Sequence, residues 1–247
     1  MGNLEAKAQP IRTREITVSA AISLKNAFED IGKVYAERNP GVKVNFNFGG
    51  SGNLARQIEA GAPVDVFASA ASKDMDDIDR KGLLAANSRK DFARNSVVLI
   101  QPVSSTIGLG SLRDLLRVEV KRIAVGNPKT VPAGRYAGEA LKHFQMWNVL
   151  KEKFVFGENV RQVLDYVARN EADAGLVYST DAAVRAKAVK IVEKLTAESH
   201  QPVVYPVGVV KGTKEEPSAK AFVDFILSPE GQKILSRYGF ISVYPFR

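Results

Sequence analysis

The chain has 247 residues, of which 45% are hydrophobic and 25% charged, and its formal net charge is +8. This length suits one large domain or two modest ones, and no apolar run approaches the length of a membrane span. The 35 basic residues are interleaved with 27 acidic ones, without zinc-finger spacing or an aromatic RNA-binding motif, so we expect no nucleic-acid partner. The absence of cysteine excludes disulfides and thiolate chemistry.

The first third of the chain alternates strands with helices. We predict strands over Glu15–Ala20, Val42–Phe48 and Val64–Ser69. Apolar residues at helical spacing follow each strand, beginning near Leu24, Leu54 and Met75. A glycine-rich turn, residues 49–52, leads into the second of these helices.

The rest of the chain continues this alternation. Further strands are predicted over Ser96–Ile100, Arg122–Val125, Ala174–Tyr178 and Val203–Val210. Between and after them, helices are predicted over Leu112–Leu116, from Pro132 to about Trp147, over Val160–Val167, and over Ser218–Tyr238 with a restart at Pro229. This pattern predicts α/β architecture with mixed, mostly parallel sheets and helices on both faces.

Four junctions ahead of helices share one chemical character. They are Ala21-Ile22-Ser23, with Ser23 as the expected N-cap, and the segments at residues 49–53, 131–134 and 157–159. Each presents backbone N–H groups without an intrahelical partner, at the positive end of a helix dipole. Several such ends brought together would bind an anion without any lysine or arginine. Ordinary helix capping explains each junction taken alone.

At these junctions the chain resembles the periplasmic molybdate-binding proteins of bacterial ABC transporters. The matching stretches are VSAAISLKNAFEDI (18–31), GGSGNLARQIEAGAPVDVFASA (49–70), GNPKTVPAGRYAGEAL (126–141) and ENVRQVLDYVARNEADAGLVYSTDA (158–182). The segment SPEGQKILSRYGF (228–240) resembles the final helix of many solute-binding receptors. The resemblance spans the chain from about Glu15 and implies two α/β lobes around a ligand cleft.

The resemblance also implies five ligand contacts: Ser23, Ser51, Ala133, Val160 and Tyr178. Ser23 and Tyr178 would donate from their hydroxyls, and Ser51 from both its hydroxyl and its backbone amide. Ala133 and Val160 would donate only backbone N–H groups. These residues would contact the oxygens of the anion, so the resemblance implies neither direct metal ligands nor catalytic residues, and no cofactor.

Domain organisation, partners and location follow from the same resemblance. One lobe would comprise residues 1–87 and 200–247, and the other residues 88–199. The protein would deliver molybdate or tungstate to the permease and ATPase of an ABC importer, as a periplasmic monomer. The N-terminal segment Met1–Ala8 lacks the apolar run of a secretion signal, so we expect that signal to be absent from this sequence.

An all-donor site selects against protonated anions. Phosphate near neutral pH carries a proton that needs an acceptor, whereas molybdate, tungstate, chromate and sulfate are free of protons. A receptor for another dianion such as sulfate is therefore the nearest alternative. An oxyanion-sensing regulatory domain is a second alternative, although the few residues before the first strand leave no room for a DNA-binding helix-turn-helix.

An enzyme is a third alternative. The glycine-rich turn lacks the Gly-Lys-Ser/Thr of a phosphate-binding P-loop, and Ser51 is not in a G-x-S-x-G elbow. The two histidines, His143 and His200, are far apart in the sequence, and no H-E-x-x-H motif occurs. We therefore expect binding rather than catalysis.

Overall fold

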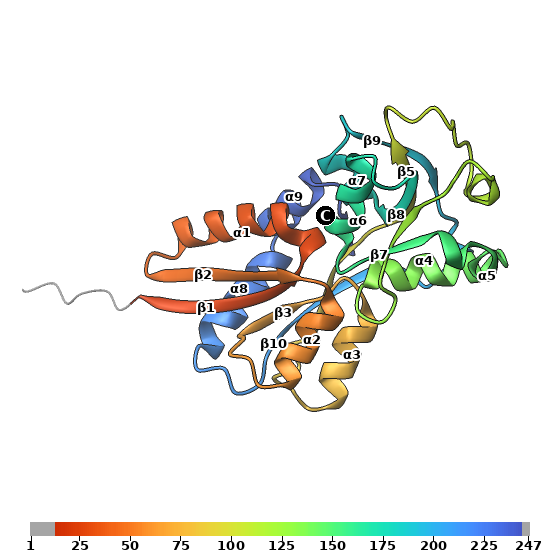
Figure 1. The fold of residues 1–247 in the computed structure, drawn as a ribbon. Helices are drawn as coiled ribbons and strands as arrows, with labels where there is room; N and C mark the ends of the chain where they lie inside the picture. The colour runs from red at the N-terminus through yellow and green to blue at the C-terminus, as the bar shows by residue number, and fades with distance from the viewer. Residues whose placement is uncertain (1–12, 244–247) are drawn as a thin grey trace, which may run out of the picture.

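The computed structural model describes residues 13–243. The N-terminal segment Met1–Ala8, on which the expectation about a secretion signal rests, lies outside the described residues. Two separate β-sheets, each flanked by helices, form two lobes (Figure 1). The two-lobed α/β architecture expected from the sequence is therefore confirmed.

The first lobe is built on a six-stranded sheet in the order β11-β4-β10-β3-β1-β2. Its strands are β1 (Arg14–Ala21), β2 (Val42–Gly49), β3 (Val66–Ala68), β4 (Lys90–Arg94), β10 (Val204–Val209) and β11 (Ile241–Ser242). Strand β1 runs parallel to β2 and β3, whereas β10 runs antiparallel to β3 and β4.

Helices cover both faces of the first sheet. They are α1 (Lys25–Arg38), α2 (Ser51–Glu59), α3 (Ser72–Arg80), α8 (Glu216–Leu227) and α9 (Pro229–Arg237). Side chains alternate across a strand, so Val66 and Ala68 of β3 join the core that contains Phe28 of α1 and Phe222 of α8. Phe67, between them, packs on the opposite face with residues of α2 and α3. Burial on both faces holds the sheet in place, and with it the helices that begin at the edge of the sheet.

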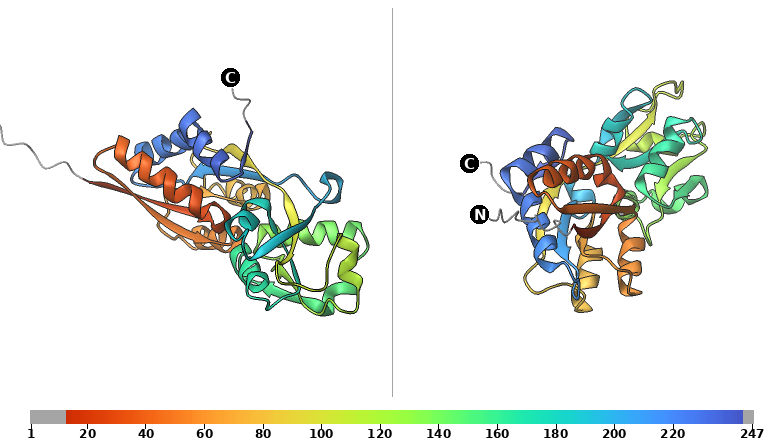
Figure 2. Two further views of the ribbon diagram at one scale, coloured as in Figure 1. Left: turned by 90° about the horizontal axis from the view of Figure 1, so that it is seen from above. Right: turned by 90° about the vertical axis from the view of Figure 1, so that its left-hand side faces the viewer.

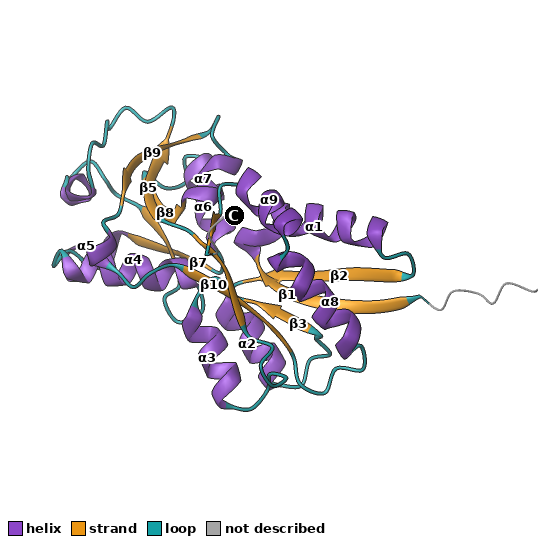
Figure 3. Ribbon diagram, turned by 180° about the vertical axis from the view of Figure 1, so that it is seen from behind, coloured by secondary structure: helices purple, strands orange, loops and turns teal. Residues whose placement is uncertain are grey.

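The second lobe is built on a five-stranded sheet in the order β7-β6-β8-β5-β9. Its strands are β5 (Val97–Pro102), β6 (Ile123–Gly126), β7 (Phe154–Gly157), β8 (Ala174–Tyr178) and β9 (Val189–Lys194). Its helices are α4 (Pro132–His143), α5 (Trp147–Leu150), α6 (Val160–Ala168) and α7 (Ser179–Val184). Viewed from behind, the strands of both lobes lie among helices (Figure 3).

The sheets are more mixed than the sequence pattern predicted. Parallel pairing is confined to β1 with β2 and β3, and to β6 with β7 and β8. The strands next to the two lobe crossings, β4, β5, β9 and β10, pair antiparallel. Strand–helix alternation predicts the parallel units, but β4 passes directly into β5, with no helix between them to indicate a change of direction.

The chain passes between the lobes twice (Figure 2). The first crossing lies at Asn95 and Ser96, between β4 and β5, and the second lies between β9 and β10, over residues 195–203. The boundary expected near Asn87 is therefore too early, because β4 pairs with β10 in the first sheet. The boundary expected near His200 falls within the second crossing.

One predicted helix ends earlier than expected, and another restarts where expected. The helix expected to run to Trp147 stops at His143, where Gln145 adopts a left-handed φ of 59° before α5 begins. The C-terminal restart at Pro229 occurs as predicted, because the Ser228 hydroxyl accepts the Gly231 amide at 3.2 Å and caps α9.

Candidate functional site

All five residues predicted to contact the ligand line one cavity between the lobes. The first lobe contributes the segment before α1 and the glycine-rich start of α2, and the second lobe contributes the starts of α4 and α6 and the end of β8. The complete lining is Ala21, Ile22, Ser23, Gly49, Gly50, Ser51, Ala70, Val131, Pro132, Ala133, Val160 and Tyr178. The four junctions identified in the sequence therefore converge.

The cavity is small. Its volume is about 10 Å³, which is about the room that one water molecule needs. A tetrahedral oxyanion has five heavy atoms, so it can enter only when the lobes move apart. Among residues 13–243, no charged side chain lines the cavity. Its attraction for an anion rests on amides, hydroxyls and helix dipoles.

Ser51 is fully buried at the first position of α2. Its hydroxyl oxygen accepts the backbone N–H of Ala70 at 3.0 Å. Because that bond occupies an acceptor position, the serine proton stays available to the cavity. The Ser51 amide, in the first helical turn, has no acceptor within its own helix. Ser51 therefore offers two donors, as its predicted role requires.

Ser23 lines the cavity but does not cap a helix. The chain forms a short 3-10 turn over Ile22–Leu24, and α1 begins at Lys25, without a side-chain cap at either start. The prediction of Ser23 as N-cap is therefore wrong, because the 3-10 turn places it inside the helical segment. Its hydroxyl instead lies 3.1 Å from the hydroxyl of Tyr205 on β10.

Tyr178, at the end of β8, reaches across the lobe interface. Its hydroxyl donates to the backbone carbonyl of Ala70 at 3.2 Å. Burial raises the pKa of Tyr178 well above its usual range, so the phenol keeps its proton. To serve an anion, this proton must turn from the Ala70 carbonyl to the ligand, a favourable exchange because a charged acceptor binds a proton more strongly.

Ala133 and Val160 present backbone amides. Ala133 is the second residue of α4, after Pro132, and Val160 is the first residue of α6. The side chain of Asn159 accepts the Gln162 amide at 3.0 Å and caps α6, which leaves the Val160 amide for another acceptor. Both amides are held on rigid helix starts, as an anion site requires.

Two arginine pairs flank the cavity from the second lobe. Arg135 of α4 pairs across the cleft with Asp74 of α3, and Arg161 of α6 pairs with Asp181 while donating to Asn26 of α1 at 2.9 Å. Burial raises the pKa of Asp74, and Arg135 partly offsets that rise. These contacts, with Tyr178 to Ala70, join the two lobes around the site.

The sequence did not single out Tyr205, Asn95 or Thr130. Tyr205 stands behind Ser23, and Asn95 donates to the Tyr205 hydroxyl at 3.3 Å. The carbonyl of Thr130, before α4, accepts the Gly52 amide across the cleft at 3.0 Å. Nothing in a single sequence distinguishes these residues, because each is an ordinary strand or loop residue until the lobes meet.

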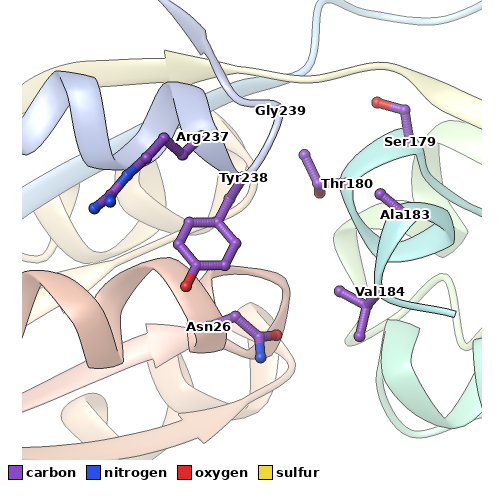
Figure 4. Close-up of a pocket in the computed structure, with 8 residues that line it drawn as sticks. All are labelled: Asn26, Ser179, Thr180, Ala183, Val184, Arg237, Tyr238 and Gly239. Carbon is purple, nitrogen blue, oxygen red and sulfur yellow. The ribbon is translucent and has the colours of Figure 1, made fainter.

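A larger cavity of about 550 Å³ lies between the start of α1, the end of α9 and helix α7 (Figure 4). The Asn26 oxygen there already accepts from Arg161, and the Tyr238 hydroxyl donates to Asp30 at 2.6 Å. Arg237 also lines this larger cavity, whereas the helix starts and the five residues predicted to contact the ligand line the smaller one. Among the residues described, no group of three histidine, cysteine or acidic side chains is placed to hold a metal ion.

The chain matches the family of bacterial extracellular solute-binding proteins over residues 16–241. It is 43% identical over 232 residues to the molybdate-binding protein ModA of Escherichia coli, covering 92% of this chain and 88% of that protein. It is 39% identical over 235 residues to ModA of Haemophilus influenzae, covering 92% of this chain and 89% of that protein.

Solved structures of the same architecture include two oxyanion receptors. The periplasmic molybdate-binding protein of Azotobacter vinelandii superposes with a TM-score of 0.81 at 26% identity, covering 94% of this chain and all of that one. The sulfate-binding protein SubI of Mycobacterium tuberculosis reaches 0.81 at 17% identity, covering 94% of this chain and 88% of that one, and shows the fold alone. Within residues 13–243, no helix is long and apolar enough to cross a membrane.

Proposed function

Because this chain belongs to the family of bacterial extracellular solute-binding proteins, we propose that it binds a tetrahedral oxyanion, molybdate first and tungstate second, for an ABC importer. The supporting observation is that Ser23, Ser51, Ala133, Val160 and Tyr178 line one enclosed cavity. Four helix starts and three hydroxyls meet there without a charged side chain.

The donor chemistry of the cavity favours a dianion without a proton. Amides can only donate, and the Ser51 hydroxyl, which accepts from Ala70, still has its proton to donate. A hydroxyl on the ligand would lie unpaired in a desolvated site, which costs about 1–3 kcal/mol. Molybdate and tungstate avoid this cost, and so does sulfate.

Sulfate is the second candidate for the ligand, favoured by the same lack of charged groups in the cavity. The choice between molybdate and sulfate depends on the size of the anion when the lobes close around it. The 39% and 43% identity to proteins named for molybdate, against 17% to a sulfate receptor, supports molybdate.

The proposed partners are the permease and ATPase of an importer, and the proposed location is the periplasm or the outer face of the cell membrane. The similarity to the periplasmic molybdate-binding protein of Azotobacter vinelandii supports the location, and 40% identity to a putative ABC transporter substrate-binding lipoprotein of Bacillus subtilis supports the importer. Binding and release, rather than catalysis, would be the activity of the isolated monomer.

Thermal unfolding with added anions tests the proposal. At a molybdate concentration of 100 Kd, ligand linkage adds about 2.7 kcal/mol of stability. For a protein of this size, that corresponds to a rise in Tm of roughly 5–10 °C. Tungstate should act similarly, and millimolar phosphate should leave Tm unchanged. If phosphate or an amino acid stabilised the protein more than molybdate at equal concentration, the proposed ligand class would be wrong.

A further inference from the structure

The orientation of the buried Asn95 side chain is set by its backbone neighbour. Its carbonyl oxygen accepts the Ser96 amide at 2.8 Å and faces the Ser179 hydroxyl at 2.9 Å. A backbone N–H can only donate, so the amide group of Asn95 must point the other way. It donates there to Thr180 at 2.9 Å and to the hydroxyl of Tyr205 at 3.3 Å.

This donation fixes the proton of Tyr205. The Tyr205 side chain is fully buried, and burial raises the pKa of Tyr205 well above its usual range, so the phenol stays protonated. Its oxygen accepts from Asn95, and its other neighbour is the Ser23 hydroxyl at 3.1 Å. The arrangement that leaves no buried proton unpaired is donation from Tyr205 to Ser23.

The consequence for Ser23 is that one of its two acceptor positions is occupied, while its proton remains free to donate to a ligand in the cavity. The Ser51 hydroxyl likewise accepts a hydrogen bond, from the Ala70 amide at 3.0 Å. Both serines therefore accept from a neighbouring group of the protein and donate toward the ligand. Tyr178 differs, because its hydroxyl donates to a carbonyl and can reorient. Discrimination between protonated and unprotonated anions rests on the two serines.

We propose that Tyr205, oriented by Asn95, is a specificity-determining residue of the oxyanion site, although it does not line the cavity. By donating to Ser23 it occupies one of the two acceptor positions of that hydroxyl, so Ser23 accepts a hydrogen bond from a protonated anion less readily. The inference rests on the proposed function, since it needs an oxyanion bound against Ser23.

The test compares Tyr205→Phe with the parent by titration calorimetry at mildly alkaline pH. The probes are molybdate, sulfate and phosphate, which is then HPO₄²⁻ and still carries a proton. The phenyl ring keeps the packing of Tyr205 against Phe92 and Phe240, whose ring centroids lie 6.2 and 5.3 Å away. We expect phosphate affinity relative to molybdate to rise at least tenfold, while the sulfate-to-molybdate ratio stays constant.

Two further variants distinguish this role of Tyr205 from a general loss of rigidity in the lobe. Tyr35→Phe removes a hydroxyl from the core of the same lobe, away from the cavity, and should leave all ratios unchanged. Ser23→Ala removes the hydroxyl itself and should weaken molybdate without strengthening phosphate. If Tyr205→Phe fails to fold, Ser23→Ala still measures how much the Ser23 hydroxyl contributes to the binding of each anion.

Three results would overturn the inference: an unchanged phosphate-to-molybdate ratio in Tyr205→Phe, an equal gain for sulfate, or a phosphate gain in Ser23→Ala. Failure of the proposed function has a different signature, because the parent protein would then bind none of the three anions. In that case both the function and the inference are overturned. If the parent prefers sulfate, the proposed ligand alone fails, and sulfate replaces molybdate as the reference.

Discussion

The donor character of the two serines in the cavity, Ser23 and Ser51, depends on the groups that form hydrogen bonds to their oxygens. The Ala70 amide and the Tyr205 hydroxyl each occupy an acceptor position on a buried serine, at 3.0 and 3.1 Å. Tyr178, by contrast, already has an acceptor in the Ala70 carbonyl. At the residue scale, the three hydroxyls should therefore contribute unequally to ligand affinity.

Ser51→Ala should weaken molybdate binding more than Tyr178→Phe, because Ser51 donates without giving up another bond. Loss of one charge-assisted hydrogen bond costs about 1.5–3 kcal/mol, or roughly ten- to a hundredfold in Kd. Titration calorimetry measures this loss. The matched control is Ser88→Ala, which removes a buried serine that accepts the Val209 amide at 3.1 Å away from the cavity. Parent-like affinity in Ser51→Ala would place the anion elsewhere.

Tyr178→Phe should cost less, because binding exchanges the Ala70 carbonyl for the anion rather than adding a bond. A net effect of about 0.5–1.5 kcal/mol, roughly two- to tenfold in Kd, follows. The fold should persist, since the ring stays packed against Tyr205 at 5.8 Å. Calorimetry beside Tyr35→Phe checks this expectation. A loss larger than that of Ser51→Ala would reverse the ranking.

The starts of helices build the site, and glycine residues allow the helix starts of the two lobes to come close together. A Cβ on Gly52 would lie 2.9 Å from both Cα and the carbonyl oxygen of Thr130, and one on Gly50 would lie 3.0 Å from the Glu158 carbonyl. These contacts are with backbone of the other lobe, which cannot move aside as a side chain can. The glycines beside Ser51 therefore allow the loops before α4 and α6 to meet α2.

Gly52→Ala should hold the lobes apart and lower molybdate affinity at least tenfold. Alanine is the better residue within helix α2, by about 0.5–1 kcal/mol, so the ligand-free protein should melt at the same or a higher temperature. Calorimetry and thermal unfolding together test these opposite effects. In Gly110→Ala the new Cβ meets only Asp114 at 3.6 Å, and neither quantity should change. Lower ligand-free stability of Gly52→Ala would instead indicate a defect in folding.

At the scale of the whole molecule, two crossings connect the lobes and several polar contacts close them. The Gly52 amide meets the Thr130 carbonyl, Tyr178 meets Ala70, and Arg135 meets Asp74. The bound anion would add further hydrogen bonds to this set, because it would accept from donors in both lobes. A ligand that bridges two bodies on a hinge shifts their population toward the closed form.

Small-angle scattering should accordingly give a smaller radius of gyration with saturating molybdate than without it. Tungstate should produce the same contraction, and phosphate at equal concentration should produce none. Superimposable curves with and without molybdate would show that the lobes are already closed before binding, or that the ligand contacts one lobe only.

The strand–helix alternation and the helix starts could be predicted from the sequence, and its resemblance to a known family pointed to five of the residues that line the cavity. These features are local, since capping residues, glycines and apolar periodicity act within a few residues. It did not predict β4, whose short, mixed sequence becomes a strand by pairing with β10. It also placed Ser23 as a cap, which the 3-10 turn contradicts.

Only the tertiary structure decided which way the hydroxyls of the site point. Asn95 and Tyr205 are 110 residues apart, and Ser23 is 182 residues from Tyr205, yet they form one chain of hydrogen bonds. The direction of that chain comes from the Ser96 amide, a fixed donor next to the first lobe crossing. A hydrogen bond has a direction only once both partners are placed, so the donor character of Ser23 depends on how the strands assemble.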